Sequence, residues 1–387
     1  MSLKIGILND SFPPTIDGVA NTAYHYARVI QQNHGDAVAV TPKYPGVRDN
    51  CPFEVYRYPS VPMPKRVGYR AGNSFSPTTV SNLVNMRFDL LHVHAPFSSS
   101  LLASQIQSKV NIPIVFTYHT KFDVDIDKRA PKPANVVMKQ LVKSNLHAAN
   151  EVWVVSRGAV ESLRHMGYNG PFKVMENGTD FRRDRAADAA VAEIDRTYRL
   201  QSGEWVFLFV GRMMWYKNVR LALDALKILK DGGLPFRMFF AGGGIDLPEI
   251  TQYAASLGLQ NNAVFLGPVS DREKLRAFFS RANLFIFPST YDTSGLVVKE
   301  AAACSLPSVL VRGSCAAEGV SDGVTGFLCG ENAPDCARAV LQAVGNSDAL
   351  RKIGRNACEQ IYLSWDDAVA KAYKRYEEIV TGWPYEY

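Results

Sequence analysis

The stretch Leu284-Phe-Ile-Phe-Pro-Ser-Thr-Tyr-Asp-Thr-Ser-Gly-Leu-Val-Val-Lys-Glu300 decides the fold. Its first part, Leu284–Phe287, is an apolar run closed by Pro288 and predicts a buried strand. The apolar run that follows Gly295 predicts a buried helix. The order is therefore strand, loop and helix N-terminus, which is the local geometry of an α/β unit.

The start of this helix is a candidate anion site. Free backbone N–H groups and the positive end of the helix dipole meet there, so an anion such as a pyrophosphate can bind without a basic side chain. Gly295 lets the backbone approach closely. Glu300 lies about one and a half turns into the helix, so it faces a different part of a ligand from Asp292. One acid could hold a sugar hydroxyl and the other a ribose.

Outside this stretch, strand-length apolar runs alternate with helix-period segments twice over, which predicts two parallel-sheet α/β domains with a cleft between them. The strands expected in the first half are Lys4–Leu8, Ala37–Thr41, Leu90–His94, Ile114–Tyr118, Val152–Val155 and Lys173–Met175. Those expected in the second half are Trp205–Gly211, Phe236–Ala241, Ala263–Leu266, Leu284–Phe287 and Ser308–Val311.

The expected domains are residues 1–183, with a C-terminal helix at about 367–387 packing back on them, and residues 184–366. The charged, alanine-rich stretch Asp180–Ser202 is the candidate linker. Proline-rich residues 51–76 predict a loop that mixes apolar and basic groups at Val61–Arg70.

The composition is typical of an ordinary soluble protein, and we expect no membrane-spanning segment. Hydrophobic residues make up 47% and charged residues 21% of the chain. No eighteen-residue apolar run and no signal segment is present, so we expect a cytoplasmic protein. Residues 1–185 hold 22 Lys and Arg against 14 Asp and Glu, or +8, while the remainder holds 21 against 23, or −2. A basic first half suits an anionic membrane surface or a phosphorylated acceptor, and nucleic acid is disfavoured because no binding motif accompanies the charge.

Neither the cysteines nor the histidines predict a metal site. The six cysteines form no metal-type pair and are expected to be buried free thiols. His92 and His94 share one face of a strand, but no third ligand is suggested. We therefore expect no metal and no cofactor.

Several motifs together resemble one family, the retaining glycosyltransferases of the GT-B fold in the group-1 (family four) class. The resemblance covers essentially the whole length. Its carriers are the opening stretch, Asn9-Asp-Ser-Phe-Pro-Pro-Thr-Ile-Asp-Gly-Val-Ala20, His92-Val-His94, Thr117-Tyr-His-Thr120, Asn177-Gly178 and Val210-Gly-Arg-Met-Met-Trp-Tyr-Lys217.

The resemblance implies a site and a reaction. Arg212 and Lys217 would neutralise the diphosphate of a nucleotide-sugar donor as it departs, and His119 would lie beside the donor sugar. Asp292 would bind the sugar and Glu300 the ribose. The backbone of the loop at Gly18 could approach a donor phosphate or the acceptor. The remaining donor contacts would come from the loop at Val269 near the base and from the amides of Ser294, Gly295, Leu296 and Val297.

One residue departs from the family pattern. The first acid of the opening motif is usually glutamate, whereas here it is Asp292, which retracts the carboxylate by about 1.5 Å. The identity of the transferred sugar is therefore open.

The expected activity is transfer of a hexose from a UDP- or GDP-sugar to an acceptor with retention. The basic first domain, the Val61–Arg70 loop and the amphipathic segment Val136–Val142 favour a membrane glycerolipid as acceptor and a peripheral place on the inner face of the cytoplasmic membrane. A soluble sugar acceptor, a nucleotide-sugar epimerase of the same fold and a non-catalytic sugar-binding module are the alternatives.

Overall fold

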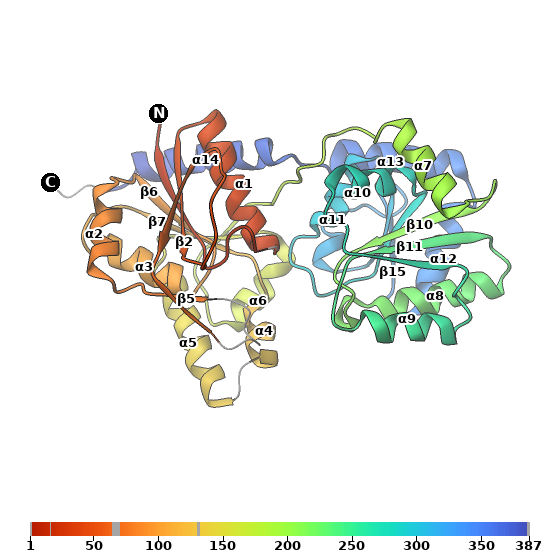
Figure 1. The fold of residues 1–387 in the computed structure, drawn as a ribbon, viewed down its shortest axis with the longest axis horizontal. Helices are drawn as coiled ribbons and strands as arrows, with labels where there is room; N and C mark the ends of the chain where they lie inside the picture. Colours follow the sequence, from red (N-terminus) through yellow and green to blue (C-terminus); the bar gives the residue numbers. More distant parts are fainter. Residues whose placement is uncertain (1, 16, 64–69, 130–131, 385–387) are drawn as a thin grey trace. The chain divides into compact units, whose positions relative to one another are not determined.

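The computed structural model describes residues 2–15, 17–63, 70–129 and 132–384. Packing divides the chain into two compact units, one made of Met1–Asn177 with Trp365–Tyr387 and the other of Gly178–Ser364 (Figure 1). Each unit is an α/β domain with its own parallel sheet and its own apolar core. The two parallel-sheet domains predicted from the sequence are thus confirmed.

The first unit is built on a seven-stranded parallel sheet in the order β3-β2-β1-β6-β7-β8-β9. Its central strands are continuous apolar runs because helices cover both faces. The strands are β1 (Lys4–Leu8), β2 (Asp36–Pro42), β3 (Glu54–Tyr58), β6 (Leu90–Val93), β7 (Ile114–Tyr118), β8 (Glu151–Val154) and β9 (Lys173–Val174). A separate antiparallel pair is formed by β4 (Ser60–Pro62) and β5 (Arg70–Gly72).

Helices connect these strands. They are α1 (Gly18–Asn33), α2 (Pro77–Asn85), α3 (Ser98–Gln107), α4 (Phe122–Arg129), α5 (Lys132–Ala148) and α6 (Val160–His165), preceded by the 3-10 turn η1 (Arg157–Ala159). The last helix of the chain, α14 (Trp365–Thr381), returns to this unit and packs on α1 (Figure 1). It is fixed there by Arg375, which pairs with Glu151, and by the Tyr373 hydroxyl, which accepts from the backbone N–H of Leu3.

The second unit has a six-stranded parallel sheet in the order β12-β11-β10-β13-β14-β15. Helices α8 and α9 lie on one face, and α7, α10 and α13 on the other (Figure 1). The strands are β10 (Trp205–Val210), β11 (Phe236–Ala241), β12 (Ala263–Gly267), β13 (Leu284–Phe287), β14 (Ser308–Val311) and β15 (Phe327–Cys329). The helices are α7 (Asp188–Tyr198), η2 (Trp215–Lys217), α8 (Val219–Asp231), α9 (Leu247–Ser256), α10 (Arg272–Arg281), α11 (Leu296–Ala303), η3 (Cys315–Ala317), α12 (Ala333–Val344) and α13 (Ser347–Gln360).

Two features differ from the sequence expectation. The stretch expected to be a linker, Asp180–Ser202, belongs to the second unit and forms α7, whose Ile194 is buried in the core. Strands β3, β4, β5 and β15 were not expected, because the first three lie in a proline-rich stretch that predicted a loop and the last is very short. Of the expected loop Val61–Arg70, residues 64–69 lie outside the described residues.

The passage between the units falls at 177/178 and 364/365, against expected boundaries at 183/184 and 366/367. A backbone bridge between Thr179 and Ser364 joins the two passing segments, and the Thr179 N–H donates to the carbonyl of Leu363 at 2.8 Å. The two segments therefore enter the second unit side by side.

No helix within the described ranges is both long and apolar enough to cross a membrane.

Candidate functional site

The second unit has a topological switch point between β10 and β13. The strand order runs outward in both directions from these two neighbours, so the loops that follow them diverge. In open parallel sheets ligands bind at the carboxyl ends of the strands at such a point. The loop after β10 carries Arg212 and Lys217, and the loop after β13 carries Asp292.

Lys217 and Asp292 form an ion pair across this switch point. The Lys217 ammonium lies 2.5 Å from Asp292 Oδ1, and the Ser289 hydroxyl donates to Asp292 Oδ2. Lys217 is buried, with 9% of its side chain exposed, against 22% for Asp292. A buried ammonium needs a counter-charge, and the carboxylate of Asp292 supplies it at the carboxyl ends of the strands.

Arg212 and Lys217 converge on one aromatic ring. The guanidinium carbon of Arg212 lies 5.9 Å and the ammonium of Lys217 5.7 Å from the centre of the Tyr216 ring. Tyr291 packs on Tyr216 at 4.5 Å between ring centres and lies 5.7 Å from the Lys217 ammonium. The two predicted cations are therefore neighbours.

Helix α11 begins directly after this cluster, as expected. Its N-cap is Gly295 in the left-handed region at φ 56°, and a Cβ there would lie 2.9 Å from the Cα of Ala316. Both facts require glycine. The Ser294 hydroxyl oxygen is buried and, among the described residues, has no hydrogen-bond partner. An unpaired buried hydroxyl beside a helix N-terminus suits a bound anion.

Glu300, the second acid of the motif, is only 8% exposed and lies further along the same helix. Its Oε1 accepts from the guanidinium of Arg272, the first residue of α10, at 2.7 Å. Burial raises the pKa of Glu300, and Arg272 opposes that rise. Sequence reasoning missed Arg272, because no motif or spacing relates it to a residue 28 positions further along the chain.

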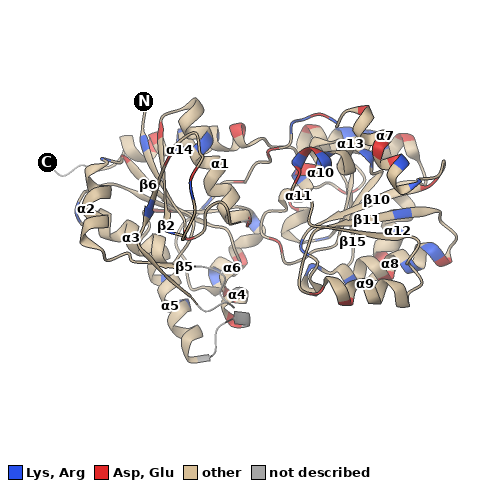
Figure 2. Ribbon diagram, in the orientation of Figure 1, with Lys and Arg blue, Asp and Glu red and all other residues tan. Residues whose placement is uncertain are grey.

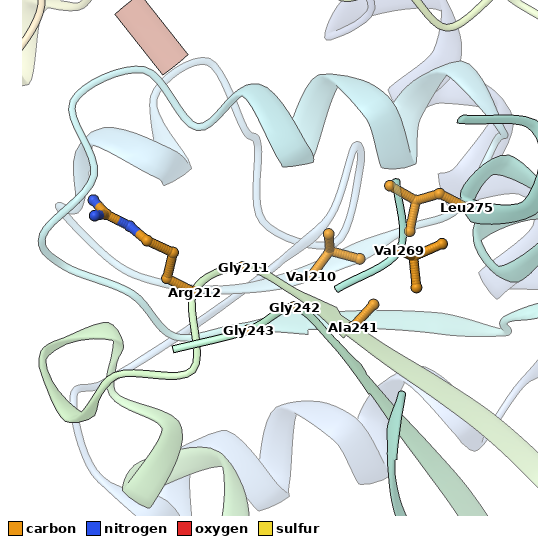
Figure 3. A pocket seen from close by; sticks show the side chains of 8 residues that line it. All are labelled: Val210, Gly211, Arg212, Ala241, Gly242, Gly243, Val269 and Leu275. Carbon is orange, nitrogen blue, oxygen red and sulfur yellow. The ribbon is translucent and has the colours of Figure 1, made fainter. Parts of the chain in front are cut away.

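A pocket of about 160 Å³ opens at the carboxyl ends of β10 and β11. The predicted residues Arg212 and Val269 both line it (Figure 3), together with Val210, Gly211, Ala241, Gly242, Gly243 and Leu275. Figure 3 shows that Arg212 extends away from the apolar side chains of Val269 and Leu275. The glycines and the apolar side chains that line the pocket suit a flat ring, and the guanidinium of Arg212 suits a charged group.

The first unit contains the other predicted residues, Gly18 and His119. His119 follows β7 and is 6% exposed, and its Nε2 lies 2.8 Å from Nδ1 of His94. The two rings are stacked, with 5.0 Å between centres. Burial lowers the pKa of His119 to about 3, so its ring is neutral near pH 7.

His92 lies in β6, which ends just before His94, and both of its ring nitrogens have partners. Nε2 lies 2.6 Å from the hydroxyl of Thr117, and Nδ1 lies 2.6 Å from the hydroxyl of Tyr376 on α14. Burial lowers the pKa of His92 well below its usual value. Within the described part of the chain no three His, Cys, Asp or Glu side chains are grouped so as to hold a metal ion.

Gly18 opens helix α1, which is capped by the carboxylate of Asp17. A Cβ at Gly18 would meet nothing within 4 Å, and its φ is not positive. Neither packing nor a turn requires glycine there.

Asp10, just after β1, was not singled out from the sequence. Its Oδ1 accepts from the N–H and the hydroxyl of Ser99 at 2.8 and 2.9 Å, whereas its buried Oδ2 has no hydrogen-bond partner among the described residues. Burial raises its pKa to about 6.

Fold and site together define a class of protein with two α/β domains and a candidate anion site at a strand switch point. Family models match both domains. Residues 191–360 match the family described as glycosyl transferases group 1, and residues 16–183 match Glycosyltransferase Family 4. The chain belongs to the group-1 glycosyltransferases.

The similar proteins are also glycosyltransferases. The chain is 27% identical over 356 residues to an alpha-monoglucosyldiacylglycerol synthase of Streptococcus pneumoniae, covering 88% of this chain and 78% of that protein. It is 22% identical to a GDP-mannose-dependent alpha-mannosyltransferase of Corynebacterium glutamicum, and the match covers 95% of this chain and 90% of that protein.

Solved structures agree on the fold. A sucrose-phosphate synthase of Thermosynechococcus elongatus superposes with a TM-score of 0.79 at 20% identity, covering 98% of this chain and 99% of that chain. HepE of Anabaena in complex with UDP and glucose superposes with a TM-score of 0.75 at 17% identity, covering 97% of this chain and 99% of that chain. The expected GT-B fold is confirmed.

Proposed function

We propose that this chain moves a hexose from a UDP- or GDP-sugar to an acceptor with retention of the anomeric configuration. The observation that carries the proposal is the cluster of Arg212, Lys217 and Asp292 at the switch point, beside the N-terminus of α11. Positive charge and free N–H groups there match a diphosphate.

In this proposal the second unit binds the donor. The base occupies the pocket beside Val269, and the amides of Ser294, Gly295, Leu296 and Val297 bind the diphosphate together with Arg212 and Lys217. Asp292 binds the sugar and Glu300 the ribose. His119 and Gly18 belong to the first unit, which we assign to the acceptor. The reaction needs no metal or cofactor.

The bond between the anomeric carbon and the phosphate oxygen breaks, and the acceptor oxygen bonds to that carbon from the same face. The acceptor proton passes to the departing phosphate, so no side-chain nucleophile is needed. Charge grows on the diphosphate as the bond breaks. Arg212 and Lys217 therefore stabilise the transition state more than the bound donor, which lowers the barrier.

Substitution of Lys217 by alanine tests the proposal. Loss of one such cation is expected to reduce kcat by roughly 100-fold or more. The thermal unfolding temperature should change little, so that the lost activity does not come from unfolding. Lys227→Ala is the matched control, because Lys227 forms an exposed pair with Asp231 on α8 of the same unit. Normal turnover in a well-folded Lys217→Ala protein would remove the proposal.

Thermal-shift measurements with a panel of UDP- and GDP-sugars identify the donor, because a ligand that binds only the folded state raises its apparent stability. Product analysis without acceptor separates the transferase from an epimerase: slow hydrolysis of the sugar supports transfer, and an epimerised nucleotide sugar contradicts it.

For the acceptor we propose a glycerolipid, with the enzyme acting at the inner face of the cytoplasmic membrane. Two similar proteins, from Streptococcus pneumoniae and Acholeplasma laidlawii, are named as synthases of alpha-monoglucosyldiacylglycerol. The first unit also exposes large apolar side chains, namely Val61, Met63, Phe75, Val136 and Val137. Transfer to diacylglycerol in mixed micelles, compared with transfer to free hexoses, decides between a lipid and a soluble sugar.

A further inference from the structure

The carboxylate of Glu300 is held by a single guanidinium that has three other contacts. Arg272 Nη2 lies 2.7 Å from Glu300 Oε1, and no other cation pairs with Glu300 among the residues that the structure describes. The same guanidinium also binds both carboxylate oxygens of Asp180, with Nε 3.0 Å from Oδ2, and its carbon lies 4.4 Å from the centre of the Phe181 ring.

These contacts fix the guanidinium in place. A forked pair with Asp180 sets its plane, and the Phe181 ring covers one of its faces. Asp180 and Phe181 follow closely on the passage into the second unit, where Thr179 is bridged to Ser364. Figure 2 shows acidic and basic residues mixed over α10 and its neighbours, so Arg272 is not one member of a uniformly basic surface.

A buried carboxylate without a cation would bind a proton. Burial already raises the pKa of Glu300, and both the charge and the hydrogen bond of Arg272 lower it. Without Arg272 the acid would be neutral over a wider pH range and free to rotate, and a protonated carboxyl is a weaker hydrogen-bond acceptor. Arg272 takes one lone pair of Oε1, which leaves Oε2 to accept from a ligand.

We propose that Arg272 is a positioning residue for nucleotide recognition: it orients Glu300 so that its carboxylate accepts hydrogen bonds from the ribose hydroxyls of the donor. The proposal rests on the proposed function, since it needs Glu300 to face the ribose. Arg272 itself does not touch the reacting atoms.

Binding of UDP and of 2′,3′-dideoxy-UDP, which lacks both hydroxyls, tests this by calorimetry, with GDP and dideoxy-GDP measured in parallel. Wild-type protein is expected to prefer the ribonucleotide by roughly tenfold or more, as hydrogen bonds to a charged group allow. In Arg272→Met this preference should fall to about threefold or less, mainly through weaker ribonucleotide binding. The KM for the donor should rise while kcat changes little, because ribose contacts stabilise bound donor and transition state alike.

Two further variants keep the test decisive. Lys274→Met removes an exposed cation from the same helix and should keep the wild-type preference. Arg272→Lys retains the charge and the fold but not the fork, and should lose at least part of the preference even if the methionine variant fails to fold.

A double-mutant cycle supplies the remaining control. In a Glu300→Gln background, adding Arg272→Met should weaken ribonucleotide binding little further, because the two residues act as one unit. Full additivity, or an unchanged preference in both Arg272 variants, overturns the proposal. If wild-type protein binds neither UDP nor GDP, the proposed function itself fails, whereas ribonucleotide binding that ignores Arg272 removes only this inference.

Discussion

At the scale of single residues, the pair of Lys217 and Asp292 is the most consequential contact in the second unit. The Lys217 ammonium is almost fully buried, so removing the Asp292 carboxylate leaves an uncompensated charge. Asp292→Asn keeps the size of the side chain but not its charge. We expect a loss of kcat of roughly 10- to 100-fold, because Lys217 is no longer held in place.

Steady-state kinetics of Asp292→Asn measure this loss. Asp231→Asn, which breaks the exposed pair with Lys227, is the control and should have wild-type kinetics. Asp292→Glu restores a carboxylate at the length usual in the family, so it should retain more activity than Asp292→Asn. An asparagine variant with full turnover would show that the charge of Asp292 is dispensable.

Asp10 predicts a pH dependence of stability. Burial raises its pKa from 3.8 to about 6, so the folded state binds the proton more tightly than the unfolded state does. The stability this contributes is present below pH 3.8 and lost as pH rises through 6, a change of about 3 kcal/mol. Asp10→Asn does not titrate, so the unfolding temperature of the variant minus that of wild type should increase between pH 4 and pH 7.

Scanning calorimetry of both proteins at matched pH values checks this sign. The comparison at each pH cancels the contribution of the buried histidines, which both proteins share. A difference that stays constant from pH 4 to pH 7 would mean that Asp10 is ionised throughout.

The local geometry of the candidate site was predictable where its residues are neighbours in sequence, and the contacts between residues far apart in sequence were not. Asp292, Ser294, Gly295 and Glu300 could be named because strand, loop and helix follow one another directly. The partners of the two acids, Lys217 and Arg272, come from other loops. Lys217 was found only through the family motif, and Arg272, which no motif marks, was missed.

At the scale of elements, long apolar runs made the central strands predictable. Strands β1, β7, β11, β13 and β14 have the expected bounds, because a strand buried on both faces must be apolar throughout. The edge strand β3 has no such apolar run, because it contains Glu54 and Arg57, and its proline-rich surroundings concealed it. Helix α7 was mistaken for part of a linker because most of its residues are exposed.

Two glycines at element ends should differ in how much alanine destabilises the protein. At Gly242, which follows β11, a Cβ would lie 1.9 Å from the carbonyl oxygen of Gly211 at the end of β10. Gly242→Ala must push these strand ends apart, so we expect the unfolding temperature to fall by roughly 5 °C or more and nucleotide binding to weaken.

Gly18→Ala adds its Cβ into open space at the start of α1. It should change the unfolding temperature by no more than about 2 °C. If the backbone at Gly18 approaches the acceptor, kcat/KM for the acceptor should fall while donor binding is retained. Wild-type kinetics would assign Gly18 no part in the site.

At the scale of the whole molecule, the two units repeat one plan. In each, the first three strands run outward in one direction and the later strands in the other. The sequence shows this repetition as two series of apolar runs, so the number and class of the domains were predictable. The exact boundaries between the two units were not predictable, because they depend on a backbone bridge between Thr179 and Ser364, which lie far apart in the chain.

Membrane binding is the last prediction, and it belongs to the first unit. The side chains of Val136 and Val137, at the start of α5, are 69% and 68% exposed, and residues 1–177 with 365–387, which make up this unit, hold 22 Lys and Arg against 17 Asp and Glu. Apolar side chains that enter the lipid interface together with basic charge bind anionic bilayers, and salt weakens the charge term. We therefore expect co-sedimentation with liposomes containing anionic lipid at low salt, and release at high salt.

A double variant, Val136→Ser with Val137→Ser, separates this from a non-specific charge effect. Both residues are exposed, so the variant should unfold at the wild-type temperature but bind liposomes at least about tenfold more weakly, since each buried valine contributes about 1.5 kcal/mol or more. Ile245→Ser removes an 82% exposed apolar residue from the second unit and should bind as wild type does. Absence of co-sedimentation at low salt would exclude the membrane surface as a partner and leave a soluble sugar as the acceptor to test.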